Sequence, residues 1–292
     1  MSWKSIADLI VEDKNAPVAI LGAPMEAGSV TPGRCDLAPA AVRKAMKRIS
    51  TYDLVEALEL EMAVHDAGDV AVAGLMPADG FAPLRDAFTG LTARHGLTLV
   101  IGGNNAVTRP AAHGLGLPLA EVGLITLDAH FDMRETDMGP RNGNPVRCLL
   151  EDGLPGANVC QIGLAPFANT RAMHEDALAA GIGIYDIEFV LAEGIEAAID
   201  DSLERLSHVA AILVDFDIDV IDRGQFPGAP GARPGGLPVW DFFRAARRLA
   251  EEERVRAVDL TEFDPSLDAS DLSALTAARW VAEILAGYSK RR

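Results

Sequence analysis

The sequence predicts an α/β protein of three layers, α/β/α, in which helices cover both faces of one doubly wound, mainly parallel sheet. Short apolar runs rich in branched residues alternate with segments of helical spacing from one end of the chain to the other. Such alternation implies parallel strands joined by right-handed crossovers. No linker, composition shift or internal repeat divides the 292 residues, so we expect a single domain over 1–292.

The first part of the chain contains three apolar runs that predict strands. The first stops at Gly22-Ala23-Pro24, and the third ends in Gly102-Gly103-Asn104-Asn105. A segment of helical spacing follows each run, and Pro39 is well placed for a helix start. We expect strands at 18–21, 58–72 and 97–101, and helices at 38–49, 81–95 and 106–115.

The second part of the chain repeats this alternation and closes with an amphipathic helix. Two polar loops interrupt it, at 135–144 and at 224–236, and the second is too rich in glycine and proline to be regular. We expect strands that begin at 122, 159, 182, 210 and 255, and helices at 145–151, 169–180, 195–206, 239–252 and 272–286.

Composition limits the classes of partner. The formal net charge of -17 argues against nucleic acid and against anionic membranes, because both would repel the chain. The three cysteines are odd in number and are not spaced as a metal knuckle or a redox pair. No apolar run has the length of a signal peptide core or of a membrane span. We therefore expect a cytoplasmic protein with reduced thiols.

One apolar run, 210–222, ends in four acids at alternate or nearly alternate positions. These acids are Asp215, Asp217, Asp219 and Asp222. Burying even one unpaired carboxylate costs several kcal/mol, so the acids must contact water, cations or bound metal. Because side chains alternate along a strand, we expect two or three of their oxygens to converge on one point.

A second run, 122–132, ends in Asp128, His130 and Asp132, which are spaced two apart and therefore face one way. Carboxylate and imidazole without thiolate favour a divalent ion such as Mn²⁺, with Zn, Fe, Co or Ni as competitors. A solvated acidic turn would explain either cluster alone. Both clusters together favour a metal site, because each follows a strand that should be buried and the carboxyl ends of parallel strands share one edge.

With these segments in order, the chain resembles the ureohydrolase family of arginase, agmatinase and formimidoylglutamase. The resemblance covers nearly the whole chain, and the two acidic motifs in this order are its most specific part. The segments that carry it are Gly22-Ala23-Pro24, Pro32-Gly33-Arg34, Asp66-Ala67-Gly68-Asp69, Gly102-Gly103-Asn104-Asn105, Asp128-Ala129-His130-Phe131-Asp132, Asp215-Phe216-Asp217-Ile218-Asp219, Pro234-Gly235-Gly236-Leu237 and Asp259-Leu260-Thr261-Glu262.

The resemblance implies an arginase-like fold and a hydroxide that one or two Mn²⁺ ions activate for attack on a guanidinium or amidine carbon. It implies that Asp128 and Asp217 bridge the metals and that His130 and Asp219 complete one site. Asp132 would bind the other ion and orient the hydroxide. Glu262 would accept hydrogen bonds from the cationic nitrogens of the substrate. It also implies a homo-oligomer, commonly a trimer or hexamer.

The chain departs from the family pattern at two positions. Asn105 stands where the family supplies a histidine ligand, and an amide oxygen is a weaker metal ligand than imidazole. Asn142 stands where arginase and agmatinase carry a histidine that shuttles protons, and asparagine carries no proton at neutral pH. Formimidoylglutamases resemble this chain in lacking the second histidine.

The substrate prediction depends on arginines that follow the motif of Asp128, His130 and Asp132. The loop 163–169 differs from the arginine-type substrate loop of the family, which usually bears acids. Basic side chains nearby would instead pair with a carboxylate of the substrate. This favours formimidoylglutamate or another guanidino acid over agmatine. The arginines are Arg134, Arg141, Arg147 and Arg171, and we expect Asn144 and Asn169 to contact the substrate with Arg147 and Arg171.

Two alternatives to a two-metal enzyme remain at this stage. Loss of the histidine at Asn105 fits an enzyme with one metal or a different metal. It also fits a non-catalytic relative that binds a metabolite or supports an oligomer. A replacement ligand would restore the site, and His65, beside Asp66, is the first histidine to check for that role.

Overall fold

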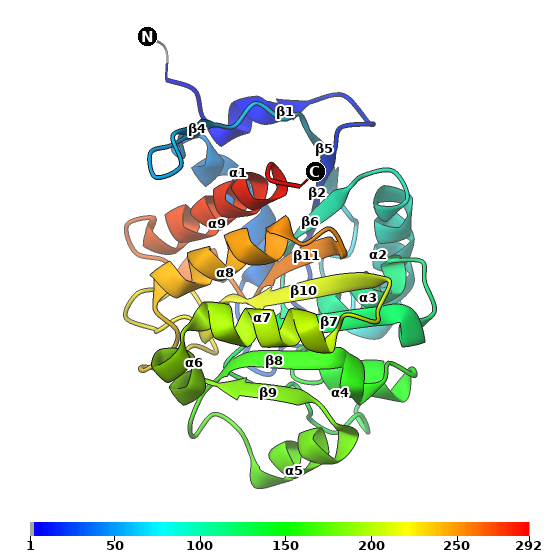
Figure 1. Ribbon diagram of the computed structural model, residues 1–292. Helices are drawn as coiled ribbons and strands as arrows, with labels where there is room; N and C mark the ends of the chain where they lie inside the picture. Colours follow the sequence, from blue (N-terminus) through cyan, green and yellow to red (C-terminus); the bar gives the residue numbers. More distant parts are fainter. Residues whose placement is uncertain (1–2, 292) are drawn as a thin grey trace.

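The computed structural model describes residues 3–291 and contains a nine-stranded central sheet (Figure 1). All its strand pairs are parallel, so the predicted doubly wound sheet is confirmed, and it is parallel throughout. Its spatial order is β1-β5-β2-β6-β11-β10-β7-β8-β9. The strands are β1 Ile10–Val11, β2 Val18–Ala23, β5 Val64–Asp69, β6 Leu97–Gly102, β7 Val122–Leu127, β8 Val159–Leu164, β9 Gly183–Asp186, β10 Ala211–Asp217 and β11 Val255–Thr261.

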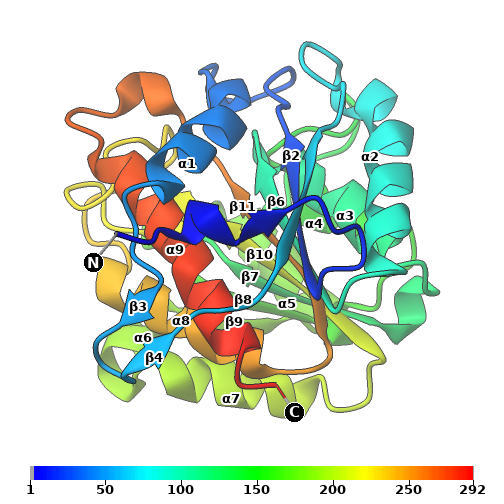
Figure 2. The ribbon, with the colours of Figure 1, turned by 90° about the horizontal axis from the view of Figure 1, so that it is seen from above.

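Helices form a layer on each face of this sheet (Figure 2). One layer contains α1, α7, α8 and α9, with α6 beside α7, and the other contains α2, α3 and α4. The helices are α1 Ala38–Met46, α2 Pro77–Thr92, α3 Thr108–Gly114, α4 Pro145–Glu151, α5 Arg171–Ala180, α6 Ile187–Glu193, α7 Ile195–Arg205, α8 Val239–Glu251 and α9 Leu272–Tyr288.

Three parts of the fold differ from the sequence prediction. The strand expected at 58–72 splits, because Leu58–Glu59 (β4) pairs instead with Tyr52–Asp53 (β3) in a small antiparallel hairpin. Strand β1 was not predicted, since two residues carry no periodicity. Helix α6 was not predicted either, because Gly194, with a φ of 92°, separates it from α7 after only two turns.

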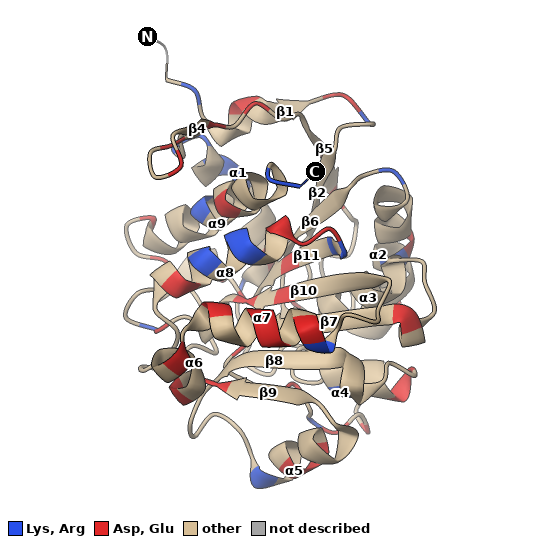
Figure 3. Ribbon diagram, in the orientation of Figure 1, with Lys and Arg blue, Asp and Glu red and all other residues tan. Residues whose placement is uncertain are grey.

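The helix layer over β10 and β11 is also joined by charge. Figure 3 shows blue segments on α8 and red segments on α7. Arg248 of α8 pairs with Asp200 of α7 at 2.8 Å, and Arg247 pairs with Glu283 of α9 at 2.6 Å.

Within residues 3–291, no helix is both long enough and apolar enough to cross a membrane.

The two central strands β7 and β10 are buried along their whole length. Each is rich in branched apolar residues, as strands covered on both faces must be. Their carboxyl ends lie side by side, because Phe216 is the register partner of Leu127. The residues that follow these two strands therefore meet at one edge of the sheet.

Candidate metal centre and substrate pocket

The first acidic cluster follows β7. Asp128 and Asp132 are buried, and His130 between them is partly exposed. The backbone N–H of His130 donates to Asp128 Oδ1 at 2.7 Å, which fixes the turn after the strand. Asp132 has a φ of 54°, in the left-handed region that residues other than glycine rarely adopt. This turn directs carboxylate, imidazole and carboxylate into the same space.

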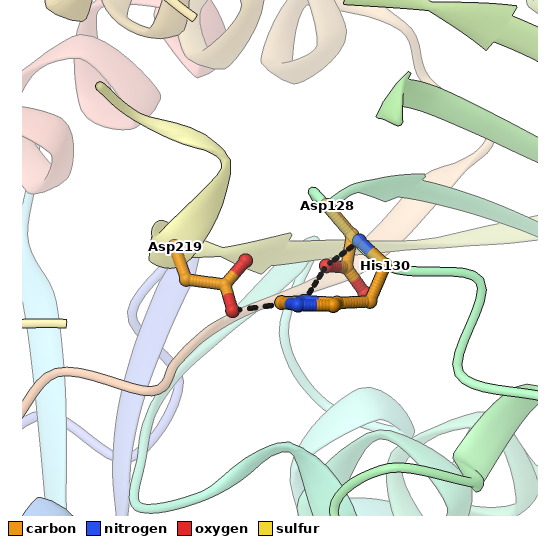
Figure 4. A group of neighbouring side chains, drawn as sticks. All are labelled: Asp128, His130 and Asp219. Atoms are coloured by element: carbon orange, nitrogen blue, oxygen red, sulfur yellow. Dashed lines mark hydrogen bonds and ion pairs between the residues drawn. The ribbon is translucent and has the colours of Figure 1, made fainter. Parts of the chain in front are cut away.

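The second cluster follows β10 and meets the first. Asp219 accepts hydrogen bonds from the backbone N–H of Ala129 at 3.4 Å, and its Oδ2 lies 3.0 Å from His130 Nδ1. The same nitrogen lies 3.4 Å from Asp128 Oδ1, so the three side chains converge (Figure 4). Asp217 caps the short helical turn after β10 by accepting the N–H of Asp219 at 3.0 Å.

Two groups of potential metal ligands overlap at one residue. Asp128, His130 and Asp219 form one group, and Asp128, Asp132 and Asp217 form the other, each with ligand atoms within 4.8 Å of one another. Asp128 Oδ2 is buried and has no hydrogen-bond partner in the described part of the chain. A buried carboxylate oxygen without a partner is costly, and a cation would satisfy it. These residues fit one or two divalent ions.

The electrostatics of the cluster point the same way. Burial, and then the charge of Asp219, raise the pKa of Asp128 to about 7. Burial also raises the pKa of Asp132 and of Asp217 well above the ordinary value. The charge of Asp219, against the opposing effect of burial, raises the pKa of His130 to about 12. Without a cation the cluster therefore retains protons, which a bound metal would displace.

The four acids of the second cluster do not act together. Only Asp217 and Asp219 belong to the ligand groups. Asp215 is fully buried beside its register partner Asp259 of β11. Asp222 accepts the N–H groups of Gly224 and Gly235, and so shapes its own loop.

Asn105 follows β6 and supports Asp132. Its Nδ2 donates to Asp132 Oδ2 at 2.7 Å, while its Oδ1 accepts from the hydroxyls of Thr108 at 2.7 Å and Thr261 at 3.1 Å. The amide nitrogen therefore faces the cluster, and an amide NH₂ is a donor that cannot ligate a metal. In this orientation Asn105 supports Asp132 by a hydrogen bond and turns its amide oxygen away from the acidic cluster, towards the two threonine hydroxyls.

Glu262 follows β11 with a φ of 60°. Its Oε1 accepts from the backbone N–H of Asn105 at 2.7 Å and from Asn142 Nδ2 at 3.0 Å. Burial, against these hydrogen bonds, raises its pKa to about 7. Glu262 therefore lines the same cavity as Asp132, Asp217 and Asp219.

A cavity of about 140 Å³ opens over the ligands. Arg134 and Arg233 both line it. The sequence analysis missed Arg233, because it lies in the irregular 224–236 loop. A second hollow of about 430 Å³ adjoins this cavity and shares Arg134 and Thr170 with it. The cavity thus combines two arginines with an acidic cluster, whereas arginines and acids are mixed in the second hollow.

The other predicted substrate residues lie in different places. Asn169 lines the cavity, but its amide already bonds the backbone of Phe131 and Ala129. Arg171 lies beside His174 in a third hollow, which shares Asn169 and Thr170 with the cavity but does not include the acidic cluster.

Two more predicted substrate residues are occupied by the protein itself. Asn144 is 1% exposed. Its side-chain amide donates to the carbonyls of Glu135 and Gly139 and accepts the backbone N–H of Arg141. Arg147 pairs with Asp176 at 2.6 Å and lines the second hollow, the one that adjoins the cavity.

His65 supplies no replacement ligand. It lies near the start of β5 and stacks on His95, with ring centroids 5.6 Å apart. Neither residue belongs to a potential metal group within residues 3–291.

Comparisons with known proteins give the family. The model of the arginase family matches residues 16–287. A formimidoylglutamase of Halalkalibacterium halodurans is 30% identical over 274 residues, which cover 92% of this chain and 86% of that protein. The formimidoylglutamase of Bacillus subtilis is 28% identical over 293 residues, covering 97% of this chain and 91% of that protein.

Solved structures agree with these relatives. The crystal structure of formimidoylglutamase from Bacillus subtilis has a TM-score of 0.93 at 25% identity and covers 99% of this chain and 93% of its own. Formiminoglutamase of Trypanosoma cruzi, solved with Mn²⁺, has a TM-score of 0.92 at 22% identity, covers all of both chains and shows the same fold.

The chain therefore belongs to the arginase family. As a member of that family it is an enzyme, a hydrolase that acts on C–N bonds, and the alternative of a non-catalytic relative gains no support.

Proposed function

We propose that the enzyme hydrolyses the C–N bond of an amidino compound that carries carboxylate groups, with formimidoylglutamate as the first candidate. The observation that carries this proposal is the overlap of the two ligand groups at Asp128, whose Oδ2 is buried and unpaired. The formimidoylglutamase relatives and the two arginines of the cavity support the substrate class.

We assign the ligand role to Asp128, His130, Asp132, Asp217 and Asp219. The Mn²⁺ bound to Trypanosoma cruzi formiminoglutamase supports Mn²⁺ as the ion, and the oxygen-rich ligand set agrees with it. When bound, the metal supplies positive charge and a hydroxide available at neutral pH. Asn105 would hold Asp132 in its ligating orientation by the hydrogen bond to Oδ2.

The remaining residues bind and orient the substrate. Among residues 3–291, no hydrogen bond reaches Glu262 Oε2, so this oxygen is left to accept an N–H of the amidinium group. Arg134 and Arg233 stand at the cavity wall and would pair with carboxylates at the far end of the substrate. The Asn142 amide donates a hydrogen bond to Glu262, but it has no titratable proton that it could transfer. The proton for the leaving amine must therefore come from water or from another group.

A product screen tests the proposal. Enzyme reloaded with Mn²⁺ is assayed for formamide, ammonia and urea released from formimidoylglutamate, agmatine, arginine and guanidino acids. We expect formamide from formimidoylglutamate and little release from agmatine, which has no carboxylate. Release from agmatine alone would contradict the assigned role of the arginines.

We further propose that the enzyme is a cytoplasmic homo-oligomer that folds as one domain. The three cysteines are free and buried, as expected for reduced thiols. Light scattering coupled to size exclusion should give about three or six times the 30.9 kDa of one chain, the mass of a trimer or hexamer.

A further inference from the structure

The loop 25–36 is fixed at its beginning to the residues that follow β6. Asn104 is fully buried, and its Nδ2 donates to the carbonyls of Glu26 at 3.0 Å and Ala27 at 3.3 Å and to Ser29 Oγ at 2.7 Å. The first residues of the loop are therefore held against the sheet edge.

The end of the same loop is fixed independently. The Glu26 carboxylate accepts the backbone N–H groups of Gly33 at 2.7 Å and Cys35 at 2.9 Å. The N–H of Arg34 donates to Asp264 Oδ2 at 2.9 Å. Both ends are thus anchored, and only the tip between them is left.

The tip of the loop, residues 30–32, is exposed. Val30 is 45% exposed, yet Val30 and Thr31 also line the cavity over the metal ligands. One contact holds the tip to the opposite wall of that cavity, since the Val30 N–H donates to Asn142 Oδ1 at 2.8 Å.

The hydrogen bond to the tip also fixes which way Asn142 faces. A backbone N–H only donates, so the atom that faces Val30 must be the amide oxygen. The nitrogen of the same amide then faces Glu262 Oε1 at 3.0 Å and donates to it. Asn142 therefore joins the loop tip to the glutamate through one rigid, planar group.

We propose that Asn142 is a positioning residue that latches the loop tip, residues 30–32, to Glu262. The latch sets the wall of the cavity and the orientation of the glutamate together, so that a change at one is transmitted to the other. The effect on the reaction rests on the proposed function of Glu262, whereas the loop contact does not depend on it.

Hydrogen exchange of the metal-free protein tests the loop contact without any activity. In Asn142→Ala the amides of segment 26–33 should exchange about five-fold faster, the effect of losing one hydrogen bond. Val30→Pro removes the donor from the other side and should give a similar increase at the remaining amides of that segment. The double variant should exchange no faster than either single variant, because both remove the same bond.

Asn142→Asp separates the two halves of the latch and covers the case in which Val30→Pro fails to fold. Its carboxylate still accepts the Val30 N–H, so exchange in 26–33 should match the wild type. The second carboxylate oxygen faces Glu262, and the two negative charges repel each other. KM for the cationic substrate should therefore change, while hydrogen exchange in segment 26–33 should not. Unchanged exchange in Asn142→Ala, or increases that multiply in the double variant, would overturn the latch. Unchanged kinetic constants in Asn142→Asp would overturn its link to Glu262, and absence of any hydrolysis in the wild type would instead refute the proposed function.

Discussion

At the scale of single residues, the site depends on two strained positions. Asp132 and Glu262 both have left-handed backbone, with φ of 54° and 60°. Such conformations persist only where the surroundings fix them. The carbonyl of Asp132 accepts the N–H of Arg147 at 3.2 Å, and the N–H of Glu262 donates to the carbonyl of Gly103 at 2.9 Å. The fold thus holds two carboxylates of the proposed site in positions that their own backbone preference does not favour.

Replacing the shared ligand should remove both metal positions at once. Loss of a residue that only hydrogen-bonds to a metal ligand lowers metal affinity by about 10- to 100-fold. Because Asp128 is assigned as a ligand itself, we expect Asp128→Asn to lower Mn²⁺ affinity by more than that. Equilibrium dialysis against Mn²⁺ measures this change. Asp222→Asn is the matched control, because Asp222 follows the same kind of strand but bonds its own loop. Equal losses in the two variants would contradict the assignment.

Arg134 should determine affinity for the acidic end of the substrate. Removing a charge-assisted hydrogen bond in Arg134→Ala should raise KM for formimidoylglutamate about ten-fold or more and leave kcat within about two-fold. Steady-state kinetics measure both constants. Arg171 lines the third hollow and not the cavity itself, so Arg171→Ala should change KM less than Arg134→Ala, and a larger effect there than at Arg134 would refute this account.

At the scale of elements, α1 is clamped by charge to β5, next to the edge strand β1 of the sheet. Arg43 of α1 donates to both oxygens of Asp66 at 2.7 and 2.8 Å and pairs with Asp69, and both acids belong to β5. The pair Arg43 and Asp66 is about four-fifths buried. Gly22 of β2 allows Asp69 this close approach, since a Cβ there would overlap its carboxylate. The Asp-Ala-Gly-Asp motif is thus explained by packing.

Loss of the clamp should lower stability in a pH-dependent way. Arg43→Ala should reduce the free energy of unfolding by about 1–3 kcal/mol at pH 7, because it leaves a largely buried carboxylate without its cationic partner. The pKa of Asp66 is lowered, since its hydrogen bonds and the charge of Arg43 outweigh burial, so the stabilisation is present above the ordinary value of about 4. It is lost as the pH falls through the lower folded pKa.

Denaturant unfolding of the wild type and the variant from pH 8 down to pH 3 checks the clamp. The difference between them should be constant above about pH 5 and shrink below about pH 4. Arg85→Ala breaks an exposed pair with Asp86 and should change stability by less than about 0.5 kcal/mol. A difference for Arg43→Ala that persists undiminished at pH 3 would show that the charge pair is not its origin.

Much of the fold was predictable because its elements carry local signals. Apolar runs bounded by glycine or acids gave the buried strands, and the acids at alternate positions after β7 and β10 meet because parallel strands end at one edge. The contacts that the sequence did not predict have no signal in neighbouring residues. Arg233 reaches the cavity from an irregular loop, and Val30 meets Asn142 across 112 residues of sequence. Nor could spacing show that Asn144 serves the backbone of its own loop.

At the scale of the whole molecule, several acidic side chains are buried together in the core. Besides the ligands, Asp215 and Asp259 are fully buried, and Asp215 Oδ2 and both oxygens of Asp259 have no partner among residues 3–291. Burial raises the pKa of both groups. The metal-free protein therefore carries an unfavourable acidic centre beneath the cavity, and metal binding should stabilise the entire fold.

Thermal unfolding should detect this stabilisation. Mn²⁺ at about 100 times its Kd should raise the Tm by about 5–10 °C relative to protein in chelator, because the ion binds the folded state only. In Asp128→Asn the increase should disappear. An equal increase in the variant would mean that Mn²⁺ binds elsewhere.

The number of Mn²⁺ ions bound per chain tests the central claim most directly. Metal analysis by mass spectrometry, after saturation with Mn²⁺ and then stepwise dialysis, gives this number. We predict two ions at saturation. The ion nearer Asn105 should be lost first during dialysis, because the Asn105 amide nitrogen faces Asp132 and offers that ion no ligand atom. A protein that retains no Mn²⁺ at saturation would contradict the metal centre.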